Sequence, residues 1–412
     1  MKNSSAWLLT RENGILVLLG TLFGMAMVDR QAIIFLGPFI VPDLHLSNSQ
    51  FGILASGLAI CWAISALTIG AWSDKLGTRK PFLIASAVLF SLLSAMSGLA
   101  TGFLLMLVIR CLTGASQGFF LPVAVSVLGP ASSPTRRGLN TGLLQNFFSS
   151  VLCGFAPIVL VLLADKWSWR WALILTAVPT LVLLPLLALF IRDPASAPKS
   201  PRMQAGINIV GDHHTLWSII FIRNIMLCML ISCMMVGWLM LFTSFSPLFL
   251  VKFRGISPQV MAGLMGVLGF SGAVTGFLAS GVSDRIGRKS VLVGACCIAL
   301  LCPLAILYYK GPIVGLGALM FVGFAGTGAM PLFMAVIPGE AVPSRLAATA
   351  MGLVICVGEI AGGFISPMVG GWLADHFDLR APIYLSATMA TLAVILSCFV
   401  RESHKRDRAR ST

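Results

Sequence analysis

Residues 70–80 read GAWSDKLGTRK, and residues 280–289 read SGVSDRIGRK. In each stretch an aspartate, Asp74 or Asp284, stands three positions before a glycine, and basic residues follow that glycine. The offset of 210 residues also superimposes further pairs of identical residues: Gly142 and Gly352, Pro157 and Pro367, Asp165 and Asp375, Arg170 and Arg380. The chain is therefore an internal duplication, with one copy of the pattern in each half.

The regions around these stretches are too apolar for a water-soluble domain. Of the 412 residues, 58% are hydrophobic and 10% are charged, and the mean hydropathy is +0.95. Soluble domains carry about 25% charged residues, and a helix of about 20 apolar residues crosses a bilayer. Apolar runs of that length predict twelve transmembrane helices: 14–39, 51–73, 81–100, 103–129, 138–164, 170–191, 217–250, 258–281, 289–308, 312–337, 346–373 and 382–400.

The duplication divides these helices into two sets of six with the same orientation, which is typical of parallel repeats about an axis along the membrane normal. We therefore expect an all-α membrane protein with a retained first helix, since that run lacks a cleavage site for a signal peptide. The expected parts are two six-helix halves, a Pro-rich cytoplasmic linker and a basic cytoplasmic tail: 1–192, 217–400, 193–216 and 401–412.

The formal net charge of +14 follows the predicted topology. With the N-terminus in the cytoplasm, 20 Lys and Arg side chains lie on the cytoplasmic side and 6 on the other. This asymmetry is the positive-inside rule, so the charge indicates orientation and not a nucleic-acid partner. Both termini are expected in the cytoplasm of a multi-pass protein of the inner or plasma membrane. The tail 401–412 is expected to be solvated, with contact to anionic lipid as the alternative.

Cysteine and histidine give no sign of a metal or cofactor. Nearly all of the 10 cysteines fall inside predicted helices, and no pair has metal-ligand spacing on a loop. The pair His213-His214 has no third ligand nearby. We therefore expect no metal, no cofactor and no catalytic residues, and a protein that is not an enzyme.

The doubled stretch resembles the loop motif of the major facilitator superfamily, Gly-x3-Asp-x2-Gly-x-Arg-Lys, at the places where that family carries it. Trp169-Arg170-Trp171 at the start of helix six is similar to another common feature of the family. The resemblance covers essentially the whole chain and implies the major facilitator fold. It also implies a gating role, through charges at helix ends, for residues of the two motifs: Asp74, Arg79, Asp284 and Lys289.

Charges inside the predicted helices do not repeat between the halves. At the offset of 210, Asp29 and Arg30 correspond to apolar residues, as does Arg110, and Glu359 corresponds to a serine. An ionisable group in hydrocarbon costs at least about 2.5–3.5 kcal/mol, so it normally faces a cavity or a partner. These four residues, with Gln117, are the candidates for substrate binding and proton coupling.

Adjacent residues on a helix point about 100° apart, so Asp29 and Arg30 cannot face one partner. We expect Asp29 to exchange a proton and Arg30 to face the cavity or a neighbouring helix; the alternative is that Asp29 neutralises an arginine of another helix. Arg110 and Gln117 share one face of helix four, where arginine could bind a carboxylate bidentately or form a structural pair. Glu359 could act in the site or be tucked against another helix.

Asp29-Arg30, together with Arg110-x3-Gly114-x2-Gln117-x4-Pro122, resembles the anion:cation symporter branch of that superfamily. The resemblance implies uptake of sugar acids and other organic anions with protons. In that branch an acidic residue usually stands where this chain has Gln117. Two possibilities then remain for coupling transport to protons: Asp29 acts alone, or Glu359 replaces the carboxylate that is missing at position 117.

We therefore expect a proton-coupled importer of a small organic anion: a mono- or dicarboxylate, a sugar acid or an aromatic acid. Its partners would be that anion, protons and the lipid bilayer, and the protein would be a monomer. A drug/proton antiporter is the alternative, suggested by the glycine-proline stretch 362–371. A non-transporting receptor is disfavoured because no loop or tail is long enough for a signalling domain.

Overall fold

The computed structural model describes residues 11–76, 78–133, 135–191, 219–343 and 346–401. Within these residues the chain forms helices and no strands, and 12 helices are long and apolar enough to cross a membrane. These spans are Arg11–Phe35, Asn48–Ala66, Lys80–Ser97, Phe103–Ala131, Arg137–Lys166, Trp169–Phe190, Arg223–Phe253, Pro258–Gly276, Arg288–Tyr308, Ile313–Glu340, Thr349–His376 and Arg380–Cys398. The predicted all-α membrane protein with twelve spans is confirmed, and most boundaries agree within a few residues.

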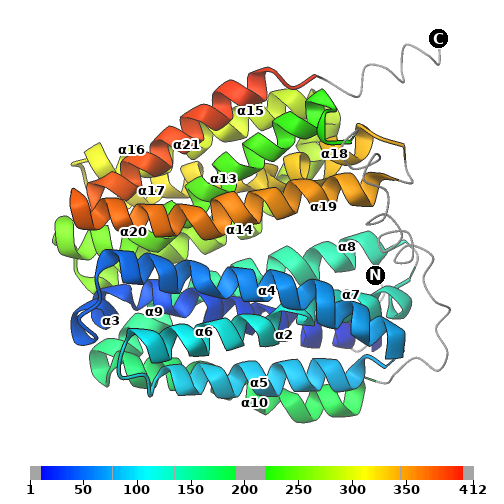
Figure 1. Ribbon diagram of the computed structural model, residues 1–412, viewed down its shortest axis with the longest axis horizontal. Coiled ribbons are helices and arrows are strands. Elements are labelled where there is room, and N and C mark those ends of the chain that lie inside the picture. Colours follow the sequence, from blue (N-terminus) through cyan, green and yellow to red (C-terminus); the bar gives the residue numbers. More distant parts are fainter. Residues whose placement is uncertain (1–10, 77, 134, 192–218, 344–345, 402–412) are drawn as a thin grey trace, which may run out of the picture. The chain divides into compact units, whose positions relative to one another are not determined.

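The chain divides into two compact units, one of Met1–Pro198 with Ile256–Ala273 and one of Lys199–Gly255 with Val274–Thr412. The first unit contains most of the N-terminal repeat (Figure 1): α2 (Arg11–Phe35), α3 (Gly37–Asp43), α4 (Asn48–Leu76), α5 (Lys80–Ser97), α6 (Phe103–Gly118), α7 (Phe120–Ala131), α8 (Arg137–Gly142), η1 (Leu143–Phe147), α9 (Phe148–Lys166) and α10 (Trp169–Phe190). The first part of α14 (Pro258–Ile286) completes it.

Polar residues and prolines fix where several of these helices begin. The hydroxyl of Ser47 accepts a hydrogen bond from the backbone N–H of Gln50, and the Gln50 side chain accepts one from the Ser47 N–H. This reciprocal pair satisfies two N–H groups that would otherwise lack partners at the start of α4. At α10 the Ser168 hydroxyl accepts from the Trp171 N–H, and α5 has Pro81 in its first turn.

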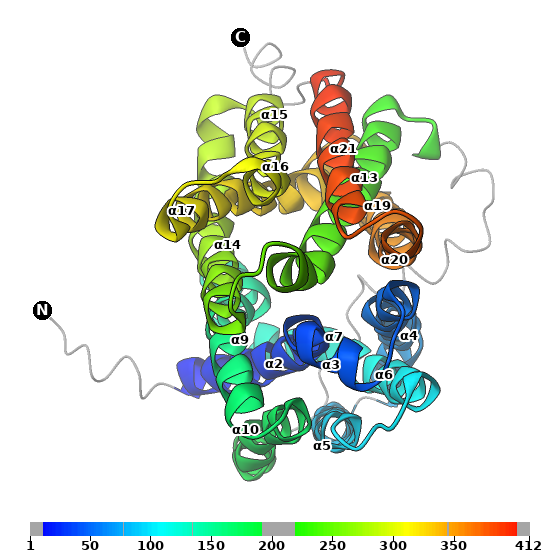
Figure 2. The same cartoon turned by 90° about the vertical axis from the view of Figure 1, so that its left-hand side faces the viewer.

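Helix α2 lies among other helices of the first unit, with α9, α10 and α7 nearby in the view along the helices (Figure 2). It packs against α9, α10 and α7, and its Phe23 ring stacks on the Phe120 ring of α7 with centroids 6.5 Å apart. Most of its apolar residues are buried, and Leu19 and Leu22 are fully so. Any polar group on the middle of α2 must therefore find its partners on neighbouring helices.

The start of α14 belongs to the first unit because its glycines allow direct backbone contact with α9. A Cβ atom on Gly269 would lie 2.4 Å from the backbone nitrogen of Gly154, and one on Gly266 would lie 2.6 Å from the Gly154 carbonyl oxygen. No side chain fits at either distance, so only glycine permits this approach. Gln259, near the start of α14, also donates to Asp165 at the end of α9, at 3.0 Å.

The second unit repeats this plan with α13 in the place of α2. Helix α13 packs against α19, α20 and α21, as α2 packs against α9 and α10. Its elements besides the rest of α14 are α13 (Arg223–Leu248), η3 (Phe249–Phe253), α15 (Arg288–Ala299), α16 (Leu301–Tyr308), α17 (Ile313–Phe324), η4 (Ala325–Ala329), η5 (Leu332–Val336), α18 (Ile337–Glu340), α19 (Ala347–Gly358), η7 (Glu359–Ile365), α20 (Ser366–His376) and α21 (Arg380–Cys398).

One contact shows how the repeat keeps its geometry while its chemistry changes. In the first unit Arg170 pairs with Asp43, with Nη2 3.0 Å from Oδ2. At the equivalent position of the second unit, 210 residues on, the Arg380 guanidinium lies 4.3 Å from the ring centre of Phe253. An ion pair in one repeat is a cation–π contact in the other.

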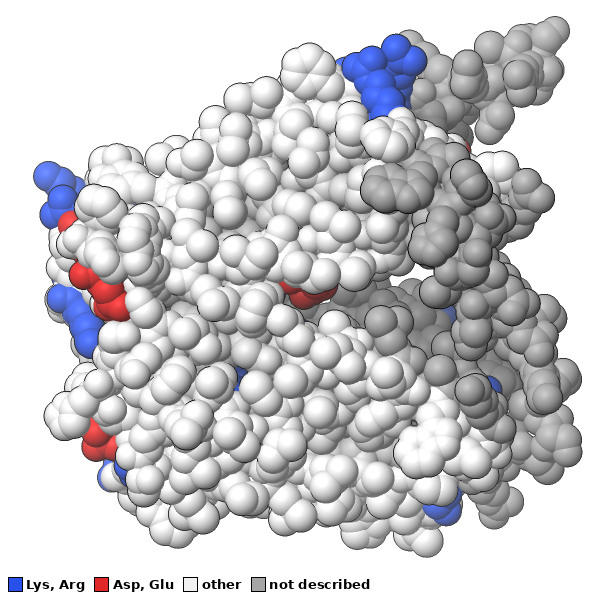
Figure 3. Space-filling model, in the orientation of Figure 1, with Lys and Arg blue, Asp and Glu red and all other residues white. Residues whose placement is uncertain are grey.

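The outer surface of the helices is apolar. Figure 3 shows the described Lys, Arg, Asp and Glu side chains gathered mainly at the two ends of the helices, with a nearly uncharged surface between them. On α10 the exposed side chains in this region include Val178, Val182 and Leu189. Such a surface suits the hydrocarbon of a bilayer, and the few charges buried beneath it require explanation.

Candidate functional site

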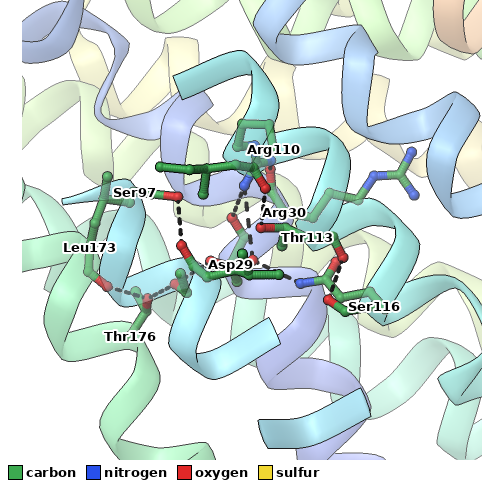
Figure 4. Close-up of polar contacts among 12 residues, drawn as sticks. Asp29, Arg30, Ser97, Arg110, Thr113, Ser116, Leu173 and Thr176 are labelled. Carbon is green, nitrogen blue, oxygen red and sulfur yellow. Dashed lines mark hydrogen bonds and ion pairs between the residues drawn. The ribbon is translucent and has the colours of Figure 1, made fainter. Parts of the chain in front are cut away.

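The carboxylate of Asp29 lies in the middle of α2, and the residue is only 3% exposed. Its Oδ1 atom accepts a hydrogen bond from the hydroxyl of Ser94 on α5. Its Oδ2 atom accepts one from the amide of Gln117 on α6 at 2.7 Å and lies 3.9 Å from Nη1 of Arg110. Three side chains from two helices thus converge on one buried carboxylate (Figure 4).

Arg110 on α6 is 2% exposed and is held mainly by the main chain of α2. Its Nη1 donates to the carbonyl of Asp29 at 3.2 Å, and its Nη2 donates to the carbonyl of Arg30 at 2.7 Å. The planar guanidinium therefore donates to the carbonyl oxygens of two consecutive residues of α2. Of the two roles that the sequence left open for Arg110, this geometry favours the structural pair, with Gln117 beside it on the same face.

Arg30 extends away from the Asp29 carboxylate, as the 100° separation of neighbours on a helix requires (Figure 4). The residue is partly exposed, and its guanidinium carbon lies 5.7 Å from the ring centre of Trp62 on α4. Within the residues that the structure describes, no carboxylate pairs with the Arg30 guanidinium. A partly exposed cation without a counter-ion, inside a membrane span, is suited to receive an anion.

The hydroxyl of Ser94 also contacts a second hydroxyl, on another helix. It lies 2.7 Å from the hydroxyl of Thr176 on α10, and Thr176 in turn donates to the carbonyl of Leu173 at 2.6 Å (Figure 4). Ser94 and Thr176 are not among the residues predicted from the sequence. The spacing Ser91-x2-Ser94-x2-Ser97 is the signal that could have found Ser94, because polar residues at intervals of three share one face of a helix.

Glu359 belongs to the second unit. It is the first residue of η7, a π-helical turn between α19 and α20, and its side chain is partly exposed. Its Oε2 atom occupies the space that a side chain on Gly363 would need, since a Cβ there would lie 2.8 Å away. Among the described side chains no hydrogen bond or ion pair reaches its carboxylate.

The gating candidates lie at helix ends. Arg79 precedes α5 and donates to the carbonyl of Ser126 on α7 at 2.6 Å. Lys289 lies in the first turn of α15, next to Arg288, whose Nη2 lies 3.3 Å from Oε1 of Glu340. The side chains of Asp74 and Asp284 lie outside the described residues, so their gating role stays a prediction.

These groups suit two chemical tasks in the first unit. Asp29 offers a water-excluded carboxylate that can hold one proton, and Arg30 offers a cation that can bind an anion. Among the described residues no cluster of three His, Cys, Asp or Glu side chains could hold a metal ion.

Comparison with known proteins identifies the family and the relatives of this chain. The sequence profile of the Major Facilitator Superfamily matches residues 19–365. The chain is 25% identical to the hexuronate transporter of Bacillus subtilis, covering 89% of this chain and 90% of that one. It is 26% identical to the gallate transporter of Pseudomonas putida, covering 91% of this chain and 88% of that one. Among solved structures, a D-xylose–proton symporter superposes with a TM-score of 0.72 and 20% identity, covering 94% and 97% of the two chains.

Proposed function

The chain belongs to the Major Facilitator Superfamily, and from that membership we propose that this transporter takes up a small organic anion together with a proton. The relatives support the substrate class, because they are transporters named for hexuronate and gallate, one a sugar acid and the other an aromatic acid. We further propose a monomer in the inner or plasma membrane with both termini in the cytoplasm. The charge asymmetry supports the placement of the termini.

The observation that carries the proposal is the separation of the two charges at positions 29 and 30. Asp29 is enclosed by Ser94, Gln117 and Arg110, which leaves room for a proton but not for a substrate. Arg30 is partly exposed, and its guanidinium lies over an aromatic ring. The proposed proton and anion sites therefore lie on neighbouring residues of α2, with their side chains about 100° apart.

Arg110 connects the proposed proton site to the proposed anion site. It donates to the carbonyls of both Asp29 and Arg30 and lies 3.9 Å from the Asp29 carboxylate. When Asp29 takes up a proton, the attraction between its carboxylate and Arg110 is lost. The excess positive charge around Arg30 then favours an anion, which couples proton binding to substrate binding. We assign the substrate contact to Arg30 and the positioning of α2 to Arg110.

Uptake into proteoliposomes tests this proposal. Labelled hexuronate and gallate, with other carboxylates, are supplied with and without an inward proton gradient. Accumulation of at least one of them should require the gradient. Asp29→Asn mimics the protonated state, so it should abolish accumulation yet retain exchange of labelled for unlabelled substrate, which needs no net proton movement.

Two further variants separate the roles. Arg30→Lys keeps the charge but loses the planar fork, so it should weaken substrate binding in detergent. Glu359→Gln should leave accumulation intact. If Asp29→Asn still concentrates substrate and Glu359→Gln does not, coupling belongs to the second unit and the assignment to Asp29 is wrong. If no carboxylate accumulates under a proton gradient, the proposed function itself fails.

A further inference from the structure

The two oxygens of the Asp29 carboxylate lie in different surroundings. Oδ2 faces the Gln117 amide nitrogen at 2.7 Å and the Arg110 guanidinium at 3.9 Å, and both of these groups can only donate. A proton on Oδ2 would be repelled by the hydrogen atoms of these two donors. Oδ1 faces the Ser94 hydroxyl, which can donate or accept. Only Oδ1 can therefore carry a proton without losing a hydrogen bond.

From Oδ1 a chain of oxygens runs to a backbone carbonyl. It passes through the hydroxyl of Ser94 and the hydroxyl of Thr176, which are 2.7 Å apart, and ends at the carbonyl of Leu173, 2.6 Å from Thr176. These oxygens form three contacts in series, but the two hydroxyls supply only two hydrogen atoms. When Asp29 is ionised, Ser94 donates to Asp29 and Thr176 donates to the Leu173 carbonyl. The contact between the two hydroxyls then holds no hydrogen atom.

Protonation supplies the missing hydrogen atom. Asp29 then donates to Ser94, Ser94 donates to Thr176, and Thr176 donates to the Leu173 carbonyl, so all three contacts are filled. The Asp29–Ser94 hydrogen bond reverses its direction and the contact between the two hydroxyls gains a hydrogen atom, without movement of a heavy atom. The proton stays on Oδ1 throughout, and no other covalent bond changes.

We infer that Ser94 and Thr176 are positioning residues for the proton of Asp29, and that their reversible hydrogen bonds stabilise the neutral acid inside the membrane. The inference rests on the proposed function only in taking the proton as the coupling ion. The elements around Asp29 carry the following charged and titratable groups: Arg11, Glu12 and Arg30 on α2, Arg110 and Cys111 on α6, Cys61, Asp74 and Lys75 on α4, Cys153, Asp165 and Lys166 on α9, Lys80 on α5 and Arg170 on α10. On α5 and α10 the charges stand in the first turn, so at the depth of Asp29 these helices contribute hydroxyl groups.

The test measures how tightly Asp29 holds its proton. Infrared difference spectra of the purified full-length protein are recorded across pH, and the band that Asp29→Asn removes is assigned to the protonated Asp29 carboxyl. Thr176→Val keeps the shape of the side chain but removes the acceptor for Ser94. Loss of one net hydrogen bond should make Asp29 bind its proton about three- to tenfold more weakly. Thr176→Ser should restore the wild-type value.

Thr180 provides a matched control. It lies one turn further along α10, it is fully buried, and its hydroxyl has no partner among the described residues. Thr180→Val should leave the proton affinity of Asp29 unchanged. Equal effects of Thr176→Val and Thr180→Val, or no effect of Thr176→Val, would overturn the inference.

The outcomes also separate this inference from the proposed function. If Thr176→Val weakens proton binding as expected but uptake ignores the pH gradient, the hydroxyl chain stands and the coupling does not. If Asp29→Asn removes no band while the wild type still accumulates substrate with the gradient, the inference is wrong and another carboxylate couples.

Discussion

Replacing Arg110 by methionine tests whether this arginine holds α6 to α2. The variant keeps most of the apolar stem but removes the guanidinium, and so removes the hydrogen bonds to the Asp29 and Arg30 carbonyls at 3.2 and 2.7 Å. It also leaves the Asp29 carboxylate without its nearby cation. Two unit charges 3.9 Å apart attract by about 4 kcal/mol at an effective dielectric of about 20.

Removing one member of a buried pair costs about 3–5 kcal/mol, because the remaining charge is uncompensated. We therefore expect Arg110→Met to lower the free energy of unfolding by about that amount. Adding Asp29→Asn removes the uncompensated charge, so the double variant should recover at least half of the loss. Arg30→Met is the matched control, since its guanidinium has no carboxylate partner among the described residues, and it should leave stability nearly unchanged.

Denaturant unfolding in mixed micelles, followed by tryptophan fluorescence, measures these differences. The coupling energy is the stability change of the double variant minus the sum of the two single changes. A loss below about 1 kcal/mol for Arg110→Met would refute the reasoning, because the buried pair would then contribute no more than an exposed one. A double variant that loses the sum of both single effects would refute it equally.

Two further predictions concern the packing of α14 and the loop motif. Gly269→Val should destabilise the protein by about 1–3 kcal/mol, because its side chain would collide with the backbone of Gly154. Gly263→Val on the same helix should not, because a side chain there has open space. Thermal melting in detergent compares the two variants. Arg79→Gln weakens the contact with the Ser126 carbonyl. It should slow transport while equilibrium substrate binding stays near the wild-type value. An equal fall in binding and transport would assign Arg79 to the substrate site and not to the gate.

The sequence was sufficient to predict the twelve spans and the duplicated plan, since length and apolarity decide whether a segment crosses a bilayer. It also pointed to Asp29 and Arg110, because a charge inside an apolar run without a counterpart in the other repeat is visible in the sequence, and to Gln117, because it shares a helix face with Arg110. It left the role of Arg110 open between an anion contact and a structural pair. Which side of a helix meets a neighbour depends on helix packing, and packing places the guanidinium on two carbonyls of α2.

Ser94 and Thr176 show the opposite case. Serine and threonine are common in transmembrane helices, where they often bond to a carbonyl one turn back, as Ser91 does to Ala87 at 2.7 Å. The serine spacing marks one polar face of α5, but it does not distinguish Ser94, whose hydroxyl turns to another helix, from Ser91. Contacts between residues 65 and 82 positions apart become visible only when α2, α5 and α10 are placed together.

The glycine contact between α9 and α14 bears on how chimaeras of this chain should be made. A fusion at the linker 193–216 would join α9 of one parent to α14 of the other. Gly154 would then meet a foreign surface, and any residue larger than glycine at position 266 or 269 would collide with its backbone. An exchange that moves Ile256–Ala273 together with the N-terminal half keeps both sides of the contact from one parent. The boundary for recombination therefore lies inside α14, after Ala273, and not at the linker between the two halves of the sequence.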